Sequence, residues 1–192
     1  MLREAFVSTL GNYFHGSYSD RHLGPAMRQY AGYARNRDGM EFNAKVANAL
    51  DALGWKTQSE VLMTKIVGKS LDRDYGDVDV LAMNPAGDRV LVIECKDLQF
   101  RKTHGEISKQ LMDFAGVVKD GKRDLLRKHL DRVQQLRANR AIVCRFVGAA
   151  PDAIIESHLV FSNPVPMQHV TGTLTEECTF HMLAGLESLG VR

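Results

Sequence analysis

The chain of 192 residues contains little cysteine, little proline and no long apolar run. Its three cysteines, Cys95, Cys144 and Cys178, are an odd number without paired spacing, which is typical of free thiols in a reducing compartment. No apolar stretch approaches the roughly 20 residues of a membrane span. The N-terminus carries Glu4 and lacks the apolar region of a signal peptide. The sequence therefore predicts a soluble, cytoplasmic protein.

The net charge excludes little, because 25 basic residues nearly balance 23 acidic ones at +2. The distribution of charge is more informative, since residues 119–140 hold eight basic side chains against three acidic ones. A helix over residues 124–138 would turn Leu126, Leu130 and Val133 inward and expose a basic face. We expect that face to consist of Arg123, Arg127, Lys128, Arg132 and Arg137. Such a face either contacts the phosphates of DNA or is only solvated.

Two adjacent segments, residues 76–82 and 90–96, carry the strongest pattern in the chain. Both are rich in β-branched and apolar residues without helical period, and turn-forming residues separate them. We therefore predict a β-hairpin. A four-residue turn from Pro85 to Asp88 would set Asn84 opposite Arg89.

This register sets Asp79 opposite Glu94 and Asp77 opposite Lys96. Because side chains alternate along a strand, all four would share one face of the sheet. Crowded carboxylates repel each other unless a cation compensates them, and Mg²⁺ prefers one or two carboxylates together with phosphate oxygens. The pattern thus indicates metal-assisted phosphodiester hydrolysis, with a surface hairpin that carries an ordinary ion pair as the alternative. The loop residues Arg101, Lys102 and His104 follow closely and are candidates for phosphate contact.

These motifs resemble the signature of the PD-(D/E)xK nuclease superfamily, and most of all its Mrr-like and Holliday-junction-resolvase-like branches. In that superfamily Gly-x-x-Asp begins one strand and Glu-x-Lys ends the next, as in Gly76 to Asp79 and Glu94 to Lys96 here. The resemblance implies catalytic roles for Asp79, Glu94 and Lys96. It also implies that Asp79 and Glu94 hold Mg²⁺ or Mn²⁺ and that DNA is the substrate.

The resemblance extends to the flanking helices. The superfamily opens the preceding helix with Gly-x-x-Phe-Glu, and the chain has Asn43 in place of that glutamate, with Glu41 two residues before it. A Gln-x-x-x-Tyr element of some branches corresponds to Gln110 and Phe114. Possible accessory site residues are therefore Asn43, Glu41, Asp77 and Gln110.

The order of predicted elements indicates an α/β fold, a three-layer α/β/α sandwich around a central mixed sheet. The resemblance implies the restriction-endonuclease-like version of that fold. Besides the hairpin, we expect helices over 40–53, 106–118, 124–138 and 176–189, and strands over 55–66, 141–147 and 157–161. Residues 39–192 should form the nuclease-like domain, and residues 1–38 an N-terminal extension or a linker from a larger polypeptide.

Two hypotheses of function remain. The first is a Mg²⁺-dependent deoxyribonuclease in restriction, anti-phage defence or DNA repair, acting as a homodimer or within a larger defence or repair assembly. The second is a catalytically inactive nucleic-acid-binding or scaffold module that retains the nuclease fold, an alternative that the departure at Asn43 and the uninterpreted N-terminal arm leave open.

Overall fold

The computed structural model describes residues 11, 14–15, 23–98, 103–169 and 177–190. The chain divides into two compact units, Met1–Phe42 and Asn43–Arg192. Helix α2 (Pro25–Ala52) runs through the boundary expected at residue 38 and begins well before its expected start at residue 40. Pro25 suits the first helical position, because its fixed φ matches a helix and its missing N–H would be unpaired there. Gly54, with φ +87°, follows the end of the helix in the left-handed conformation that glycine favours.

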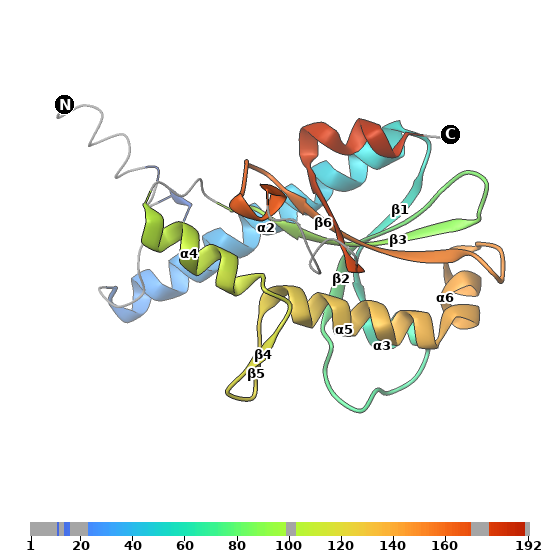
Figure 1. Ribbon diagram of the computed structural model, residues 1–192, viewed down its shortest axis with the longest axis horizontal. Helices are drawn as coiled ribbons and strands as arrows, with labels where there is room; N and C mark the ends of the chain where they lie inside the picture. The colour runs from blue at the N-terminus through green and yellow to red at the C-terminus, as the bar shows by residue number, and fades with distance from the viewer. Residues whose placement is uncertain (1–10, 12–13, 16–22, 99–102, 170–176, 191–192) are drawn as a thin grey trace. The chain divides into compact units, whose positions relative to one another are not determined.

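The centre of the second unit is a five-stranded mixed sheet with the order β1-β2-β3-β6-β7 (Figure 1). The first three strands pair antiparallel, and β3, β6 and β7 pair parallel. The strands are β1 (Lys56–Leu62), β2 (Asp77–Met83), β3 (Arg89–Lys96), β6 (Ile154–Phe161) and β7 (Thr179–Met182). The predicted α/β fold with a central mixed sheet is confirmed.

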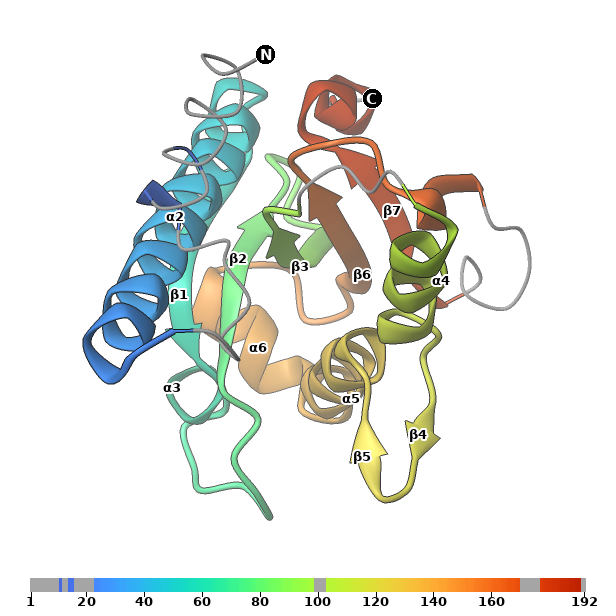
Figure 2. The same cartoon turned by 90° about the vertical axis from the view of Figure 1, so that its left-hand side faces the viewer.

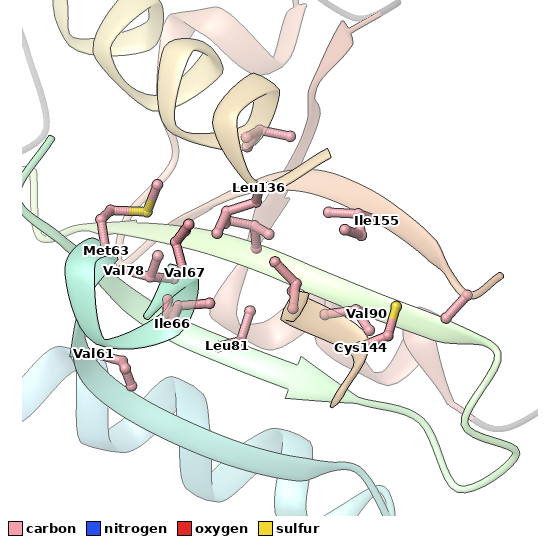
Figure 3. Packing of buried hydrophobic residues seen from close by; sticks show 14 residues of the cluster. Val61, Met63, Ile66, Val67, Val78, Leu81, Val90, Leu136, Cys144 and Ile155 are labelled. Carbon is pink, nitrogen blue, oxygen red and sulfur yellow. The ribbon is translucent and has the colours of Figure 1, made fainter. Parts of the chain in front are cut away.

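Helices cover both faces of this sheet. One face packs against α3 (Met63–Val67), α5 (Leu125–Ala138) and α6 (Arg140–Val147), whose apolar side chains form one core with the strands (Figure 3). The 3-10 helix η3 (Leu183–Leu189) and the last turns of α2 lie on the opposite face (Figure 1). There the buried Trp55 donates its Nε1–H to the carbonyl of Leu189 at 3.2 Å.

The remaining elements lie in the crossover from β3 to β6 and near the C-terminus. They are α4 (His104–Asp113), a small hairpin of β4 (Val118–Lys119) and β5 (Lys122–Arg123), and η2 (Pro166–His169). Thr103 caps α4 by a capping box with Glu106. Asp124 caps α5 by accepting the Arg127 N–H at 2.7 Å.

Two expected elements are wrong. Residues 141–147 form helix α6, because Val143 and Cys144 enter the core from one helical face and Gly148 ends the helix with φ +79°. A short apolar run does not distinguish a buried strand from a helix by period alone. The C-terminal helix expected over 176–189 is instead β7 followed by η3, because Thr179–Met182 pairs with β6. The strand expected over 55–66 also ends early, at Leu62, where α3 begins.

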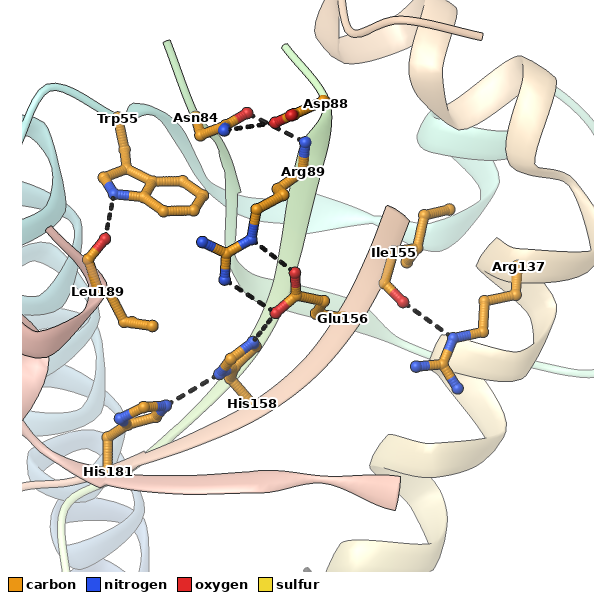
Figure 4. A network of polar contacts seen from close by, with 10 residues as sticks. All are labelled: Trp55, Asn84, Asp88, Arg89, Arg137, Ile155, Glu156, His158, His181 and Leu189. Carbon is orange, nitrogen blue, oxygen red and sulfur yellow. Dashed lines mark hydrogen bonds and ion pairs between the residues drawn. The ribbon is translucent and has the colours of Figure 1, made fainter. Parts of the chain in front are cut away.

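A polar network crosses the sheet face that lies away from α5 (Figure 4). Arg89 binds both carboxylate oxygens of Glu156, with Nε to Oε1 at 2.7 Å and Nη2 to Oε2 at 3.1 Å. His158 contacts Glu156 Oε2 at 3.3 Å through Nε2 and His181 at 2.9 Å through Nδ1. The hydrogen bond with His158 and the bonds from Arg89 hold the pKa of Glu156 at about 2, against the effect of burial.

Glu156→Gln should make the free energy of unfolding depend less on pH under acidic conditions. A carboxylate whose pKa falls on folding stabilises the fold above its unfolded pKa of 4.5, and this contribution disappears as the pH falls toward about 2. Because Glu156 is partly exposed, we expect it to supply roughly 1 to 2 kcal/mol. Urea unfolding of wild type and variant at pH 5.5 and 3 measures this, with the exposed Glu187→Gln as the control. If wild type and Glu156→Gln lose the same free energy of unfolding between the two pH values, the lowered pKa of Glu156 is contradicted.

Candidate active site

The β2–β3 hairpin has the predicted turn and register. Asn84 donates its N–H to the carbonyl of Arg89 at 3.1 Å, and Gly87 in the turn takes a φ of +73°. The backbone ladder pairs Met83 with Val90 and ends with Val80 opposite Ile93. Asp79, Glu94 and Lys96 lie beyond this end, on the sheet face that α5 covers.

Beyond the last backbone pair, the side chain of Asp79 takes the place of a backbone carbonyl as hydrogen-bond acceptor for β3. Its Oδ2 accepts the N–H of Cys95 at 2.7 Å, which fixes the carboxylate beside Glu94. Burial raises the pKa of Asp79 to about 7, and the charge of Glu94 adds to this effect. Asp79 is therefore a carboxylate whose negative charge is poorly compensated by the surrounding protein.

Glu94 is buried and bound by two cations. Lys96 Nζ lies 2.6 Å from Oε1, and Arg132 Nη2 lies 2.6 Å from Oε2. Burial acts to raise the pKa of Glu94, but the charges of Lys96 and Arg132 outweigh it and hold the pKa below its usual range. Burial also acts against the charge of Lys96, yet Glu94 and Asp79 raise the pKa of this ammonium overall. The predicted catalytic residues Asp79, Glu94 and Lys96 are thus brought together.

Helix α5 supplies two buried polar side chains to this site. His129 lies with Nδ1 3.9 Å from Glu94 Oε2, and burial lowers its pKa to about 3, so it is neutral. Arg132 also donates to the backbone carbonyl of Asp77. The prediction that Arg132 belongs to an exposed basic face is therefore wrong. The buried stripe of α5 is rotated toward His129 and Arg132, and Leu130 is only partly buried.

The other predicted phosphate-binding residues are dispersed. Arg127 is half-buried and Lys128 is exposed on α5, and His104 is the exposed first residue of α4. Arg101 and Lys102 lie outside the described residues. Of the predicted basic face, only Lys128 and Arg137 are exposed, and Arg137 also donates to the carbonyl of Ile155.

The accessory positions include one acidic residue that the sequence did not reveal. Asn43 is buried and donates through Nδ2 to the carboxylate of Glu60, on β1. Burial raises the pKa of Glu60, and a hydrogen bond with Asp77 adds to this effect. Glu60 takes a φ of +55°, which is rare for a residue with a side chain. The register of β1 against β2 sets Glu60 opposite Asp79, because Ser59 faces Val80 and Val61 faces Val78. A predicted pairing of these two strands is therefore the sequence signal that could have found Glu60.

The remaining accessory candidates differ in environment. Gln110 is buried in α4, and neither atom of its amide has a hydrogen-bond partner among the described residues. Glu41 is exposed on α2. Of these two, only Gln110 has buried polar atoms that a ligand could satisfy.

Comparison with known proteins gives a family for the chain. The model of a family described as anti-phage protein Upx-like matches residues 1–180. The chain belongs to this Upx-like family. Its role therefore lies in anti-phage defence. No curated protein and no solved structure matches the chain.

The acidic residues of this Upx-like protein suit a divalent cation by their chemistry. Asp79 and Glu94 offer two neighbouring carboxylates on one face, which is the donor type that Mg²⁺ and Mn²⁺ prefer. Within the described ranges, no group of three or more acidic, histidine or cysteine side chains is arranged to hold a metal ion. A cation at this site would be held by Asp79 and Glu94.

Over the described residues, every helix is too short or too polar to be a candidate membrane span.

Arg132→Leu should strongly destabilise the Upx-like protein. The substitution leaves the buried Glu94 with one cation and the carbonyl of Asp77 without its donor. Breaking a buried ion pair costs about 3 to 5 kcal/mol, and we expect the lower end because Lys96 remains.

Chemical denaturation measures this loss, with Lys128→Leu as the matched control on the same helix. The exposed Lys128 should change stability by no more than about 0.5 kcal/mol. Equal stability of the two variants would mean that the pair of Arg132 and Glu94 does not support the fold.

Proposed function

We propose that this Upx-like protein is a metal-dependent nuclease that hydrolyses DNA phosphodiester bonds in the cytoplasm during anti-phage defence. The observation that carries the proposal is the convergence of Asp79, Glu94 and Lys96 at one end of the β2–β3 hairpin. Buried charged groups stabilise a fold poorly even when they are paired, so a catalytic role explains Asp79, Glu94 and Lys96 better than a structural one.

The topology supports the same proposal. The motifs resemble those of the PD-(D/E)xK superfamily, and here they lie on adjacent antiparallel strands after an N-terminal helix, with a crossover to the parallel strand β6. Membership of an anti-phage family agrees with an enzyme that attacks nucleic acid.

Each residue has a role in the proposed reaction. Asp79 and Glu94 would hold Mg²⁺ or Mn²⁺, which supplies positive charge to a phosphate oxygen and activates water for in-line attack. Lys96 carries its proton in the ion pair with Glu94, so we assign it to stabilise charge on the phosphate rather than to take a proton from water. Arg132 orients Glu94 from the opposite side.

A second candidate function follows from the same ion pairs. Each carboxylate oxygen of Glu94 already carries one cation, so Lys96 and Arg132 compete with a metal ion for this group. If these ion pairs keep the metal out, the chain is a nucleic-acid-binding or scaffold module without hydrolytic activity.

Incubation of the purified chain with plasmid, linear and single-stranded DNA, each with and without Mg²⁺, separates the two candidates. We expect cleavage of at least one substrate, only with the metal. Binding without cleavage of any of them would favour the scaffold module, and the nuclease proposal would fail.

A further inference from the structure

Three arginines converge on one carboxylate beside the candidate active site. Arg73, Arg123 and Arg127 lie within 2.7, 3.2 and 2.7 Å of the carboxylate of Asp131. They come from three separate segments: the loop before β2, the end of β5, and the first turn of α5. Asp131 is buried, and one carboxylate cannot neutralise three guanidinium groups.

The same arginines line a hollow of about 490 Å³. Val118 and Gly121 of the β4–β5 hairpin, and Gly116 just before it, also line the hollow. Figure 2 shows this hairpin next to α5. Arg73 also stacks on the ring of Tyr75 at 4.5 Å from the ring centre, which holds its planar group in place. The hollow is therefore an open surface depression, whose three arginines and one aspartate give an excess charge of about +2.

We infer that this arginine hollow binds a backbone phosphate of the nucleic acid that the proposed nuclease cleaves. Planar guanidinium groups match phosphate oxygens in pairs, and Asp131 already holds three of them toward a shared point. The inference deepens the proposed function and rests on it for the identity of the ligand.

The arginine hollow and the carboxylate site share one turn of α5, because consecutive residues of that turn contact each of them. Asp131 gathers the arginines, and the next residue, Arg132, binds Glu94 and the carbonyl of Asp77. Arg73 precedes Asp77 by four residues in the loop that leads into β2. The hollow and the carboxylate site are therefore connected through consecutive residues of α5 and through the loop before β2.

A purely structural role makes a different prediction about Asp131. If the arginines only tie the loop and the hairpin to α5, Asp131→Asn weakens the structure and brings no gain in binding. If they form a phosphate site, Asp131 competes with the ligand, and Asp131→Asn strengthens DNA binding. The sign of the change in affinity separates the two roles.

Fluorescence anisotropy with labelled duplex DNA, without divalent metal and at several salt concentrations, tests the inference. We expect Arg73→Gln/Arg123→Gln to bind roughly tenfold more weakly at low salt, with a salt slope smaller by about 0.9 for each lost contact. Asp131→Asn should bind several-fold more tightly than wild type. Arg145→Gln, which removes one exposed charge from α6, is the matched control and should bind like wild type.

Unchanged affinity of the double variant, or unchanged or weaker binding by folded Asp131→Asn, would overturn the inference. A second arm titrates a nucleoside monophosphate and inorganic phosphate. Binding of either that the double variant loses, while DNA affinity stays unchanged, would assign the hollow to a free phosphate compound instead.

The binding measurement does not depend on cleavage. If wild type binds DNA through the hollow but cuts no substrate, the proposed nuclease activity fails and the phosphate site remains. If wild type cuts DNA while the double variant binds and cuts as wild type does, the phosphate site fails and the nuclease remains.

Discussion

Asp79→Asn, Glu94→Gln and Lys96→Met should each reduce DNA cleavage by at least about a thousandfold, because each removes one charge that the proposed reaction requires. Asp79→Asn is the sharpest of the three. The asparagine oxygen can still accept the N–H of Cys95, so the hairpin end keeps its structure while the proposed metal site loses a carboxylate.

Initial rates on the preferred DNA substrate measure these losses, and circular dichroism verifies the fold of each variant. Asp113→Asn, at an exposed position of α4, is the matched control and should cleave at the wild-type rate. A wild-type rate in any of the three folded site variants would remove that residue from the reaction.

Cleavage should require Mg²⁺ or Mn²⁺ and stop completely in excess chelator. Ca²⁺ should permit DNA binding without hydrolysis, because it takes a looser and higher coordination and does not enforce the geometry of attack. Isothermal titration calorimetry of Mn²⁺ should show one binding event that Asp79→Asn removes, since Asp79 offers the less compensated carboxylate. Undiminished cleavage in chelator would exclude a metal mechanism.

Local chemistry was sufficient to predict the hairpin and its three principal residues. The turn at Asn84 to Arg89 defines the register, and the register places Asp79 and Glu94 on one face. Helix α6 was not predictable in the same way, because its apolar run satisfies the pattern of a buried strand as well as that of a helix.

The remaining site residues depend on tertiary structure. Arg132 is buried because α5 rotates His129 and Arg132 toward the sheet, and an inward stripe of leucine and valine side chains does not reveal that rotation. Glu60 contacts Asn43 and Asp77 from a left-handed backbone conformation in β1. No local sequence motif predicts this conformation for a glutamate.

The crossover between β3 and β6 has a consequence for the order of folding. The β2–β3 hairpin closes over a short turn, whereas Arg132 arrives from a helix far downstream that must pack across the sheet. Local contacts form before distant ones, because closing a long loop costs more chain entropy. The hairpin should therefore form while Asp79 and Glu94 face each other with Lys96 as their nearest cation. When α5 packs on the sheet, Arg132 adds the second positive charge beside Glu94. The two carboxylates therefore come together early in folding, and their second cation arrives late.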